Sequence, residues 1–161
     1  VSALLGDYWN EEQANRIALK TAEQEMQSLT GVDQYFAIYN RGTSLVNLLD
    51  YAGASAAYDA AFGLYESLAS NQRPWRMLWY QTGPYFAYYY SGRYQDLIDL
   101  TSLTLKNANN PFLEETYYWR GLGYLMVGRQ DDAVADFYSA LEYHPNFEPP
   151  TAQLRSLGLI Q

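Results

Sequence analysis

A pattern of small and aromatic residues in segment 114–145 restricts how this chain can fold. Gly121 is followed three residues later by Tyr124, and a Gly-Arg turn follows at 128–129. The pattern then continues through Ala133, Phe137, Ala140 and Pro145. Small residues are needed where two antiparallel helices nearly touch, and aromatic rings fill the space beside that contact. Proline ends the second helix because it lacks an N–H group and its ring clashes with the preceding turn. The pattern predicts a helical hairpin.

Segment 34–70 repeats this pattern without a gap. When Gly42 is aligned with Gly121, the other matched pairs are Tyr39 with Tyr118, Arg41 with Arg120, Ala54 with Ala133, Tyr58 with Phe137, and Ala61 with Ala140. Leu45 replaces the tyrosine of the first helix, and no proline closes the second helix. We therefore predict a second hairpin of the same type, whose second helix continues to about residue 69.

Segment 74–108 resembles a degenerate copy of the same hairpin. Pro74 suits the first turn of a helix, and Gly92-Arg93-Tyr94 is typical of a turn between helices. The second helix has an apolar face formed by Leu97, Leu100, Leu103 and Leu105. If Trp79 and Gly83 occupy the aromatic and glycine positions, the first helix carries extra residues before the turn.

We expect additional helices at both ends of the three hairpins. An N-terminal helix over 8–30 would be capped by Asn10, and Gly31 would end it. Tyr8 and Trp9 would then either fasten the helix start or mark a docking surface. The apolar face of this helix is predicted to contain Ala14, Ile17, Ala18, Thr21, Ala22, Met26 and Leu29.

Three further boundaries follow from capping residues and prolines. Asp33 would cap the helix of segment 34–70. Asn110 would cap the helix of segment 111–145, and Pro111 would open it. At the C-terminus, 148–150 would form a stiff linker before a short capping helix over 150–158. Ala152, Leu154 and Leu157 would be buried there, because the end of a helical array needs a cap for its apolar face.

Composition excludes several classes of function. The net charge of −8 disfavours binding to nucleic acid or to anionic membrane surfaces. The chain contains no cysteine, which excludes disulfides, thiol catalysis and thiolate metal sites. No apolar run is long enough to predict a transmembrane helix. The first residue is Val1, and we expect the 161 residues to be one domain of a longer protein.

The Gly-Tyr-Ala-Phe-Ala-Pro spacing of 114–145 resembles the tetratricopeptide repeat (TPR). The resemblance covers the three hairpins, and it implies an all-α solenoid whose first helices line a concave groove for a peptide or a partner helix. Segments 40–62 and 74–94 also look like the C-terminal TPR segment of bacterial proteins that carry a papain-like cysteine peptidase domain. No peptidase residue can be transferred, because this chain has no cysteine to act as nucleophile.

The TPR layout implies a set of groove residues on the three first helices. They are Tyr39, Thr43 and Asn47 in the first hairpin, Tyr80, Pro84 and Tyr88 in the second, and Tyr118, Leu122 and Met126 in the third. Nine aromatic residues are crowded into 75–94. They form either an ordinary core or an aromatic pocket, which a kink at Gly83-Pro84 would open.

Arg41 and Arg120 occupy the position immediately before the small glycine, where the family usually has leucine. In a structural interpretation their stems pack and their guanidinium groups reach a carboxylate, with Asp59 and Asp136 as the candidates. In a functional interpretation they hold a carboxylate group of a bound peptide.

Catalytic patterns are weak. His144 lies at a helix end, where the helix dipole favours it, and the acidic pairs 114–115 and 131–132 lie in first helical turns. We therefore expect neither an enzyme nor a cofactor. The leading hypothesis is a non-catalytic peptide- or protein-binding module. The alternatives are a structural domain that packs on an upstream domain or on a second copy, and a small-molecule or enzyme site near Trp79 and Tyr88.

Overall fold

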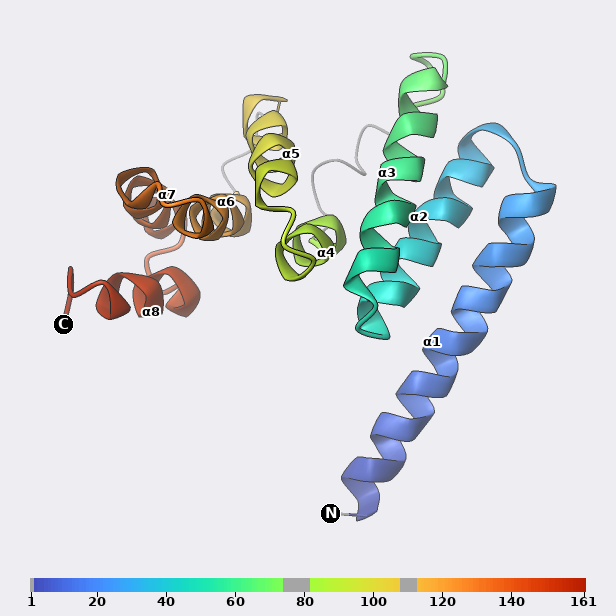
Figure 1. The fold of residues 1–161 in the computed structure, drawn as a ribbon, viewed down its shortest axis with the longest axis horizontal. Coiled ribbons are helices and arrows are strands. Elements are labelled where there is room, and N and C mark those ends of the chain that lie inside the picture. Colours follow the sequence, from blue (N-terminus) through green and yellow to red (C-terminus); the bar gives the residue numbers. More distant parts are fainter. Residues whose placement is uncertain (1, 74–81, 108–112) are drawn as a thin grey trace. The chain divides into compact units, whose positions relative to one another are not determined.

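The computed structural model describes residues 2–73, 82–107 and 113–161, and this part of the chain is all-helical, with eight helices and no strand (Figure 1). The prediction of an all-α fold is confirmed. The helices are α1 (Ser2–Ser28), α2 (Gly31–Asn47), α3 (Tyr51–Ser67), α4 (Gly83–Tyr90), α5 (Tyr94–Asn107), α6 (Glu114–Met126), α7 (Gln130–Tyr143) and α8 (Glu148–Ser156). None of them is long and apolar enough to cross a membrane.

The chain divides into two compact units, Val1–Ser91 (unit 1) and Gly92–Gln161 (unit 2). The boundary falls in the predicted turn at Gly92-Arg93-Tyr94, so the predicted middle repeat over 74–108 is shared between the units. Its expected start at Pro74 and its aromatic position Trp79 lie outside the described residues.

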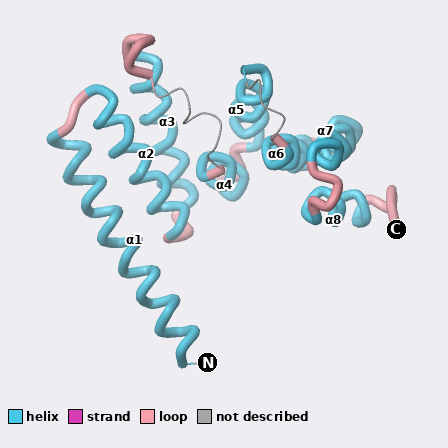
Figure 2. The backbone as a smooth tube through the Cα atoms, turned by 180° about the vertical axis from the view of Figure 1, so that it is seen from behind, coloured by secondary structure: helices cyan, strands magenta, loops and turns pink. Residues whose placement is uncertain are grey.

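Unit 1 is built on the predicted hairpin of α2 and α3, with α1 packed along α2 (Figure 2). Gly42 lies against the ring of Tyr58, and a methyl group at Gly42 would come within 2.8 Å of that ring. This is the close helix contact that the sequence pattern predicts. Around it lies a buried core that contains Tyr35, Ile38, Tyr39, Leu45, Ala54, Ala57, Tyr58, Ala61, Leu68 and Ala87.

Unit 2 contains the hairpin predicted from segment 114–145, which is formed by α6 and α7. A methyl group at Gly121 would lie 2.6 Å from Cε1 of Phe137 and 3.2 Å from the carbonyl oxygen of Ala133. Ala133, Phe137 and Ala140 are completely buried. The same glycine–aromatic contact therefore holds together the α2–α3 and α6–α7 hairpins, as the gapless alignment of the two segments predicts.

Three turns between consecutive helices share one backbone conformation. Gly92 and Gly128 have φ of 76° and 79°, and Leu49 has φ of 63° at the corresponding place between α2 and α3. The following amide closes the turn in both hairpins: Asp50 N donates to Leu45 O at 2.9 Å, and Arg129 N donates to Tyr124 O at 2.8 Å. A left-handed conformation is strained for leucine and unstrained for glycine.

The N-terminal helix differs from its prediction. It begins at Ser2, so Asn10 lies inside α1 and is no cap, and Tyr8 and Trp9 cannot fasten its start. Ala3, Leu4 and Leu5 favour helix, and this propensity extends α1 on the N-terminal side of the capping signal. Its buried face is also narrower than predicted, because Ile17 is 67% exposed and Ala14, Ala18 and Thr21 are exposed too.

Three other predicted boundaries are wrong. Thr30, not Asp33, is the N-cap of α2, and Asp33 lies in its first turn. Pro84 lies in the first turn of α4, where proline needs no kink, so the predicted mid-helix kink is absent from α4. The predicted linker 148–150 forms the first turn of α8, and Pro150 is buried. Leu113 precedes α6 as its N-cap, while Asn110 and Pro111 lie outside the described residues.

Candidate functional site

The predicted groove positions on α2 separate into one buried and two exposed residues. Tyr39 is only 2% exposed, because its ring packs against Tyr58 at 4.9 Å between ring centres and against Phe62 at 6.5 Å. It is a core residue of unit 1 and does not line an open groove. Thr43 and Asn47, one and two turns further along α2, are exposed.

Tyrosine hydroxyls in this core are poorly solvated. The hydroxyls of Tyr35 and Tyr39 are buried and have no hydrogen-bond partner among the residues that the structure describes. Burial raises the pKa of both groups well above the usual range, since no water stabilises a phenolate there. Tyr58 lies 3.3 Å from the Thr43 hydroxyl, and burial raises its pKa to about 12. These tyrosines are therefore neutral structural groups at physiological pH.

The groove positions predicted on α4 are also buried where they can be described. Pro84 and Tyr88 both lie in the core of unit 1, and the Tyr88 hydroxyl donates a hydrogen bond to Asp59 at 2.8 Å. Tyr80 lies outside the described residues. The sequence left open an ordinary core or an aromatic pocket for this region. The buried residues of α4 fit the ordinary core.

On α6 the predicted groove residues differ in exposure. Leu122 is 7% exposed, Met126 is 48% exposed, and Tyr118 is half-buried. The Tyr118 ring makes an edge contact with Phe147 and a tilted contact with Phe137. Of these three, Met126 has the largest exposed fraction.

The two equivalent arginines have different partners. Arg120 donates two hydrogen bonds of 2.7 Å to the buried Asp136, and its guanidinium group lies over the rings of Tyr117 and Tyr124. The hydrogen bond to Asp136 raises the pKa of Arg120. This geometry fits the structural interpretation and the predicted partner Asp136. Arg41 instead approaches Glu23 of α1 at 3.4 Å, and the predicted partner Asp59 is bonded to Tyr88.

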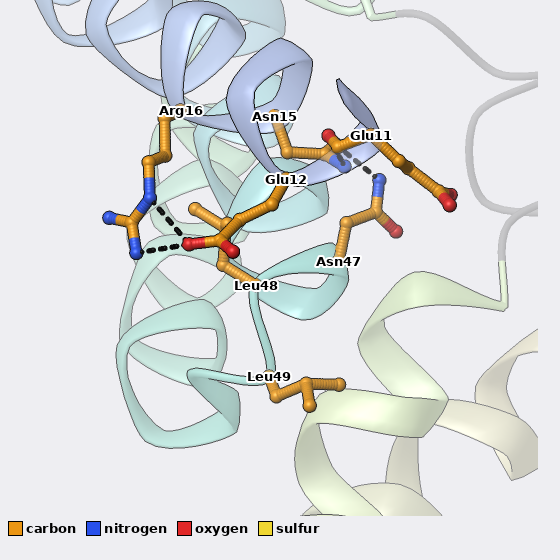
Figure 3. A pocket seen from close by; sticks show the side chains of 7 residues that line it. All are labelled: Glu11, Glu12, Asn15, Arg16, Asn47, Leu48 and Leu49. Carbon is orange, nitrogen blue, oxygen red and sulfur yellow. Dashed lines mark hydrogen bonds and ion pairs between the residues drawn. The ribbon is translucent and has the colours of Figure 1, made fainter. Parts of the chain in front are cut away.

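A pocket of about 350 Å³ lies where α1 passes the turn between α2 and α3 (Figure 3). One predicted groove residue, Asn47, belongs to it. The rest of the lining comes from one stretch of α1 and from the turn itself: Glu11, Glu12, Asn15, Arg16, Leu48 and Leu49. The pocket is therefore the place where a groove position of α2 meets charged groups of another helix.

Hydrogen bonds order the polar side of the pocket. Asn47 Nδ2 donates to Asn15 Oδ1 at 2.9 Å, and Asn15 Nδ2 donates to the carbonyl oxygen of Glu11 at 2.9 Å. Arg16 binds Glu12 through two nitrogens, at 2.6 and 2.8 Å. In Figure 3 the Glu11 carboxylate points away from this ion pair, toward the side where Asn47 directs its carbonyl oxygen.

Sequence reasoning missed all of this pocket except Asn47. The stretch 11–16 reads as the polar side of an isolated helix, and nothing in its spacing indicates that it faces a turn more than 30 residues later. Leu49 could have been noticed, since it stands where the turn at 128 has glycine. Among the described residues, no three His, Asp or Glu side chains are placed to hold a metal ion.

No family model, curated protein or solved structure matches this chain. The site must therefore be interpreted from its own geometry and chemistry.

Proposed function

We propose that this chain is a non-catalytic helical-repeat module that binds a peptide segment of a partner protein. The observation that carries the proposal is the arrangement on α2, whose exposed residues Thr43 and Asn47 lead into the pocket beside α1. The two hairpins with their glycine–aromatic contacts support a TPR-like solenoid, a fold that presents its first helices to ligands.

The binding surface proposed here is smaller than the groove implied by the TPR resemblance. Tyr39, Tyr88 and Leu122 are buried, so they contribute to helix packing and are closed to a ligand. Thr43, Asn47 and Met126 remain exposed to a ligand within their respective units. The amide of Asn47 can hydrogen-bond a peptide backbone, and the pocket of about 350 Å³ beside it is near the lower end of the size range of ligand pockets.

A displayed library of random peptides tests this function. The full chain and its Asn47→Lys variant are used for selection, because a lysine at this position fills the pocket entrance. Ala56→Lys is the matched control, since Ala56 is exposed on α3 and lies outside the pocket lining. We expect selected peptides to bind the wild type and the control alike, and to bind Asn47→Lys about tenfold more weakly, a loss of about 1.4 kcal/mol.

Two outcomes would contradict the proposal. Either no peptide is enriched over an empty support, or the selected peptides bind the Asn47→Lys variant as tightly as the wild type. Circular dichroism of each variant separates lost binding from lost helix. A change of one exposed helical residue is expected to leave stability within about 0.5 kcal/mol.

The exposed face of α1 favours a second function, self-association. Ile17 is 67% exposed, and Ala14, Ala18 and Thr21 lie beside it on the same side of the helix. Two copies could bury this face against each other. Sedimentation at increasing concentration decides: a mass that doubles in the wild type and stays constant in Ile17→Glu supports association, and a constant mass in both contradicts it.

A further inference from the structure

Hydrogen-bond acceptors that a ligand can reach line one side of the pocket beside Asn47. The Nδ2 groups of Asn15 and Asn47 each donate one hydrogen bond inside the site, and each keeps a second N–H group. The guanidinium of Arg16 is held by Glu12. The acceptors open to a ligand include the Asn47 carbonyl oxygen and the Glu11 carboxylate, and Glu11 forms no ion pair within the part of the chain that the structure describes. A carboxylate accepts hydrogen bonds and cannot donate them.

The charges of the lining point the same way. Glu11 and Glu12 contribute two negative charges, and Arg16 contributes one positive charge that is already paired with Glu12. One negative charge is therefore left without a counterpart. Anionic ligands are repelled, and a cation with several N–H donors matches both the charge and the open acceptors.

The other wall of the pocket is apolar. Leu48 and Leu49 line it, and Leu49 is 61% exposed in the left-handed turn. Lysine and arginine combine a cationic end with an aliphatic stem, and such a stem packs on apolar surface while the charged end stays in a polar environment. A pocket with acceptors on one side and leucines on the other therefore suits these two side chains.

We infer that the pocket receives a lysine or arginine side chain of the bound peptide. Its cationic end lies between the Glu11 carboxylate and the Asn47 carbonyl oxygen, and its stem lies against Leu49. This inference rests on the proposed peptide-binding function and names the residue class that the peptide must supply. The net charge of the chain agrees with this inference, because a chain with net charge −8 attracts basic segments over long distances.

The test uses the peptides selected on the full-length wild type. We expect lysine or arginine at one position in most of them. A peptide with that position changed to norleucine, which keeps the stem and loses the charge, is compared with the parent on wild type and on Glu11→Gln. Glu25→Gln is the control, because Glu25 is exposed on α1 and lies roughly 20 Å along the helix from Glu11, at 1.5 Å per residue.

We expect Glu11→Gln to weaken the parent peptide about two- to fivefold, as for a solvent-exposed charge pair. The norleucine peptide should bind Glu11→Gln and wild type equally, and Glu25→Gln should change neither. High salt should reduce the difference between the two peptides. Because Glu11 is exposed, its substitution tests binding and not folding.

The failures of the two proposals are distinguishable. Selected peptides without an enriched basic position, or equal effects of Glu11→Gln on parent and norleucine peptides, overturn the pocket assignment and leave peptide binding standing. The absence of any selected peptide overturns the proposed function, and the pocket assignment falls with it.

Discussion

The hairpins α2–α3 and α6–α7 have the same helix contact and the same turn conformation, but they differ in the turn residue and in the partners of their arginines. Both place a glycine of the first helix on an aromatic ring of the second, Gly42 on Tyr58 and Gly121 on Phe137. Their turns differ, with Leu49 in one and Gly128 in the other. Their arginines differ as well, since Arg120 is held by a buried aspartate and Arg41 by an exposed glutamate. The glycine–aromatic contact is therefore common to both hairpins, whereas the turn residue and the arginine partner are particular to each.

The difference between the arginines lies in burial. Asp136 is 6% exposed at its side chain and Arg120 20%, whereas Glu23 and Arg41 are 48% and 30% exposed. Water screens the exposed pair of Arg41 and Glu23. In the more buried pair, Arg120 depends on Asp136 for the compensation of its charge. Equivalent positions in the two hairpins are therefore expected to contribute unequally to stability.

The largest effect is expected for the buried ion pair. Asp136→Ala leaves the Arg120 guanidinium buried without its carboxylate, which should destabilise unit 2 by about 3 kcal/mol. Glu23→Ala should change stability by less than about 1 kcal/mol, because the pair at Arg41 is exposed. Urea denaturation of both variants measures the contrast. Equal losses would show that the two arginines are equivalent.

A double variant sharpens this result. Arg120→Met combined with Asp136→Leu removes both charges and keeps much of the volume. We expect it to recover most of the stability that Asp136→Ala loses, since the main penalty comes from the unpaired charge. If the double variant is as unstable as the single one, the ion pair itself stabilises unit 2.

The glycine contacts come next in size. Gly121→Ala places a methyl group against both the Phe137 ring and the Ala133 backbone oxygen, whereas Gly42→Ala meets only the Tyr58 ring. Overpacking lowers the free energy of unfolding by about 1–3 kcal/mol, and the better helix propensity of alanine offsets part of this loss. We expect Gly121→Ala to cost more, because a backbone oxygen cannot move aside as a ring can. Denaturation of the two variants side by side checks this order.

The smallest effect is expected at the turns and has opposite signs in the two hairpins. Leu49→Gly should stabilise unit 1 by up to about 1 kcal/mol, because it relieves a left-handed leucine. Gly128→Ala should destabilise unit 2 by about 1 kcal/mol for the same reason. Thermal unfolding measures both. A loss of stability in Leu49→Gly would mean that the leucine side chain makes contacts worth more than its strain.

Much of the hairpin geometry could be predicted from local patterns. The spacing of Gly121, Ala133 and Phe137 predicts which residues touch across two antiparallel helices, and these residues are buried in contact. The same holds for Gly42 and Tyr58. Local signals failed where a competing preference was stronger. In α1, helix propensity makes the helix begin at Ser2, eight residues before the predicted cap Asn10.

The candidate site depended on tertiary structure. The TPR resemblance implied a line of groove residues, but whether a side chain on that line is open depends on what the neighbouring helices cover. Tyr39 became a core residue because rings of α3 surround it, while Asn47 stayed exposed at the end of α2. Exposure is a property of the packed helices and has no signature in one helix alone.

By itself the sequence determined the helix pairs, because small and aromatic residues at set spacings act within one hairpin and over short separations. The pocket, the exposed face of α1 and the unequal partners of the two arginines were decided by tertiary structure. The pocket and the contact of Arg41 join residues of α1 to residues of α2, such as Glu23 with Arg41 or Asn15 with Asn47. No local pattern specifies such pairs, because they form only when packed helices bring the two side chains within hydrogen-bonding distance.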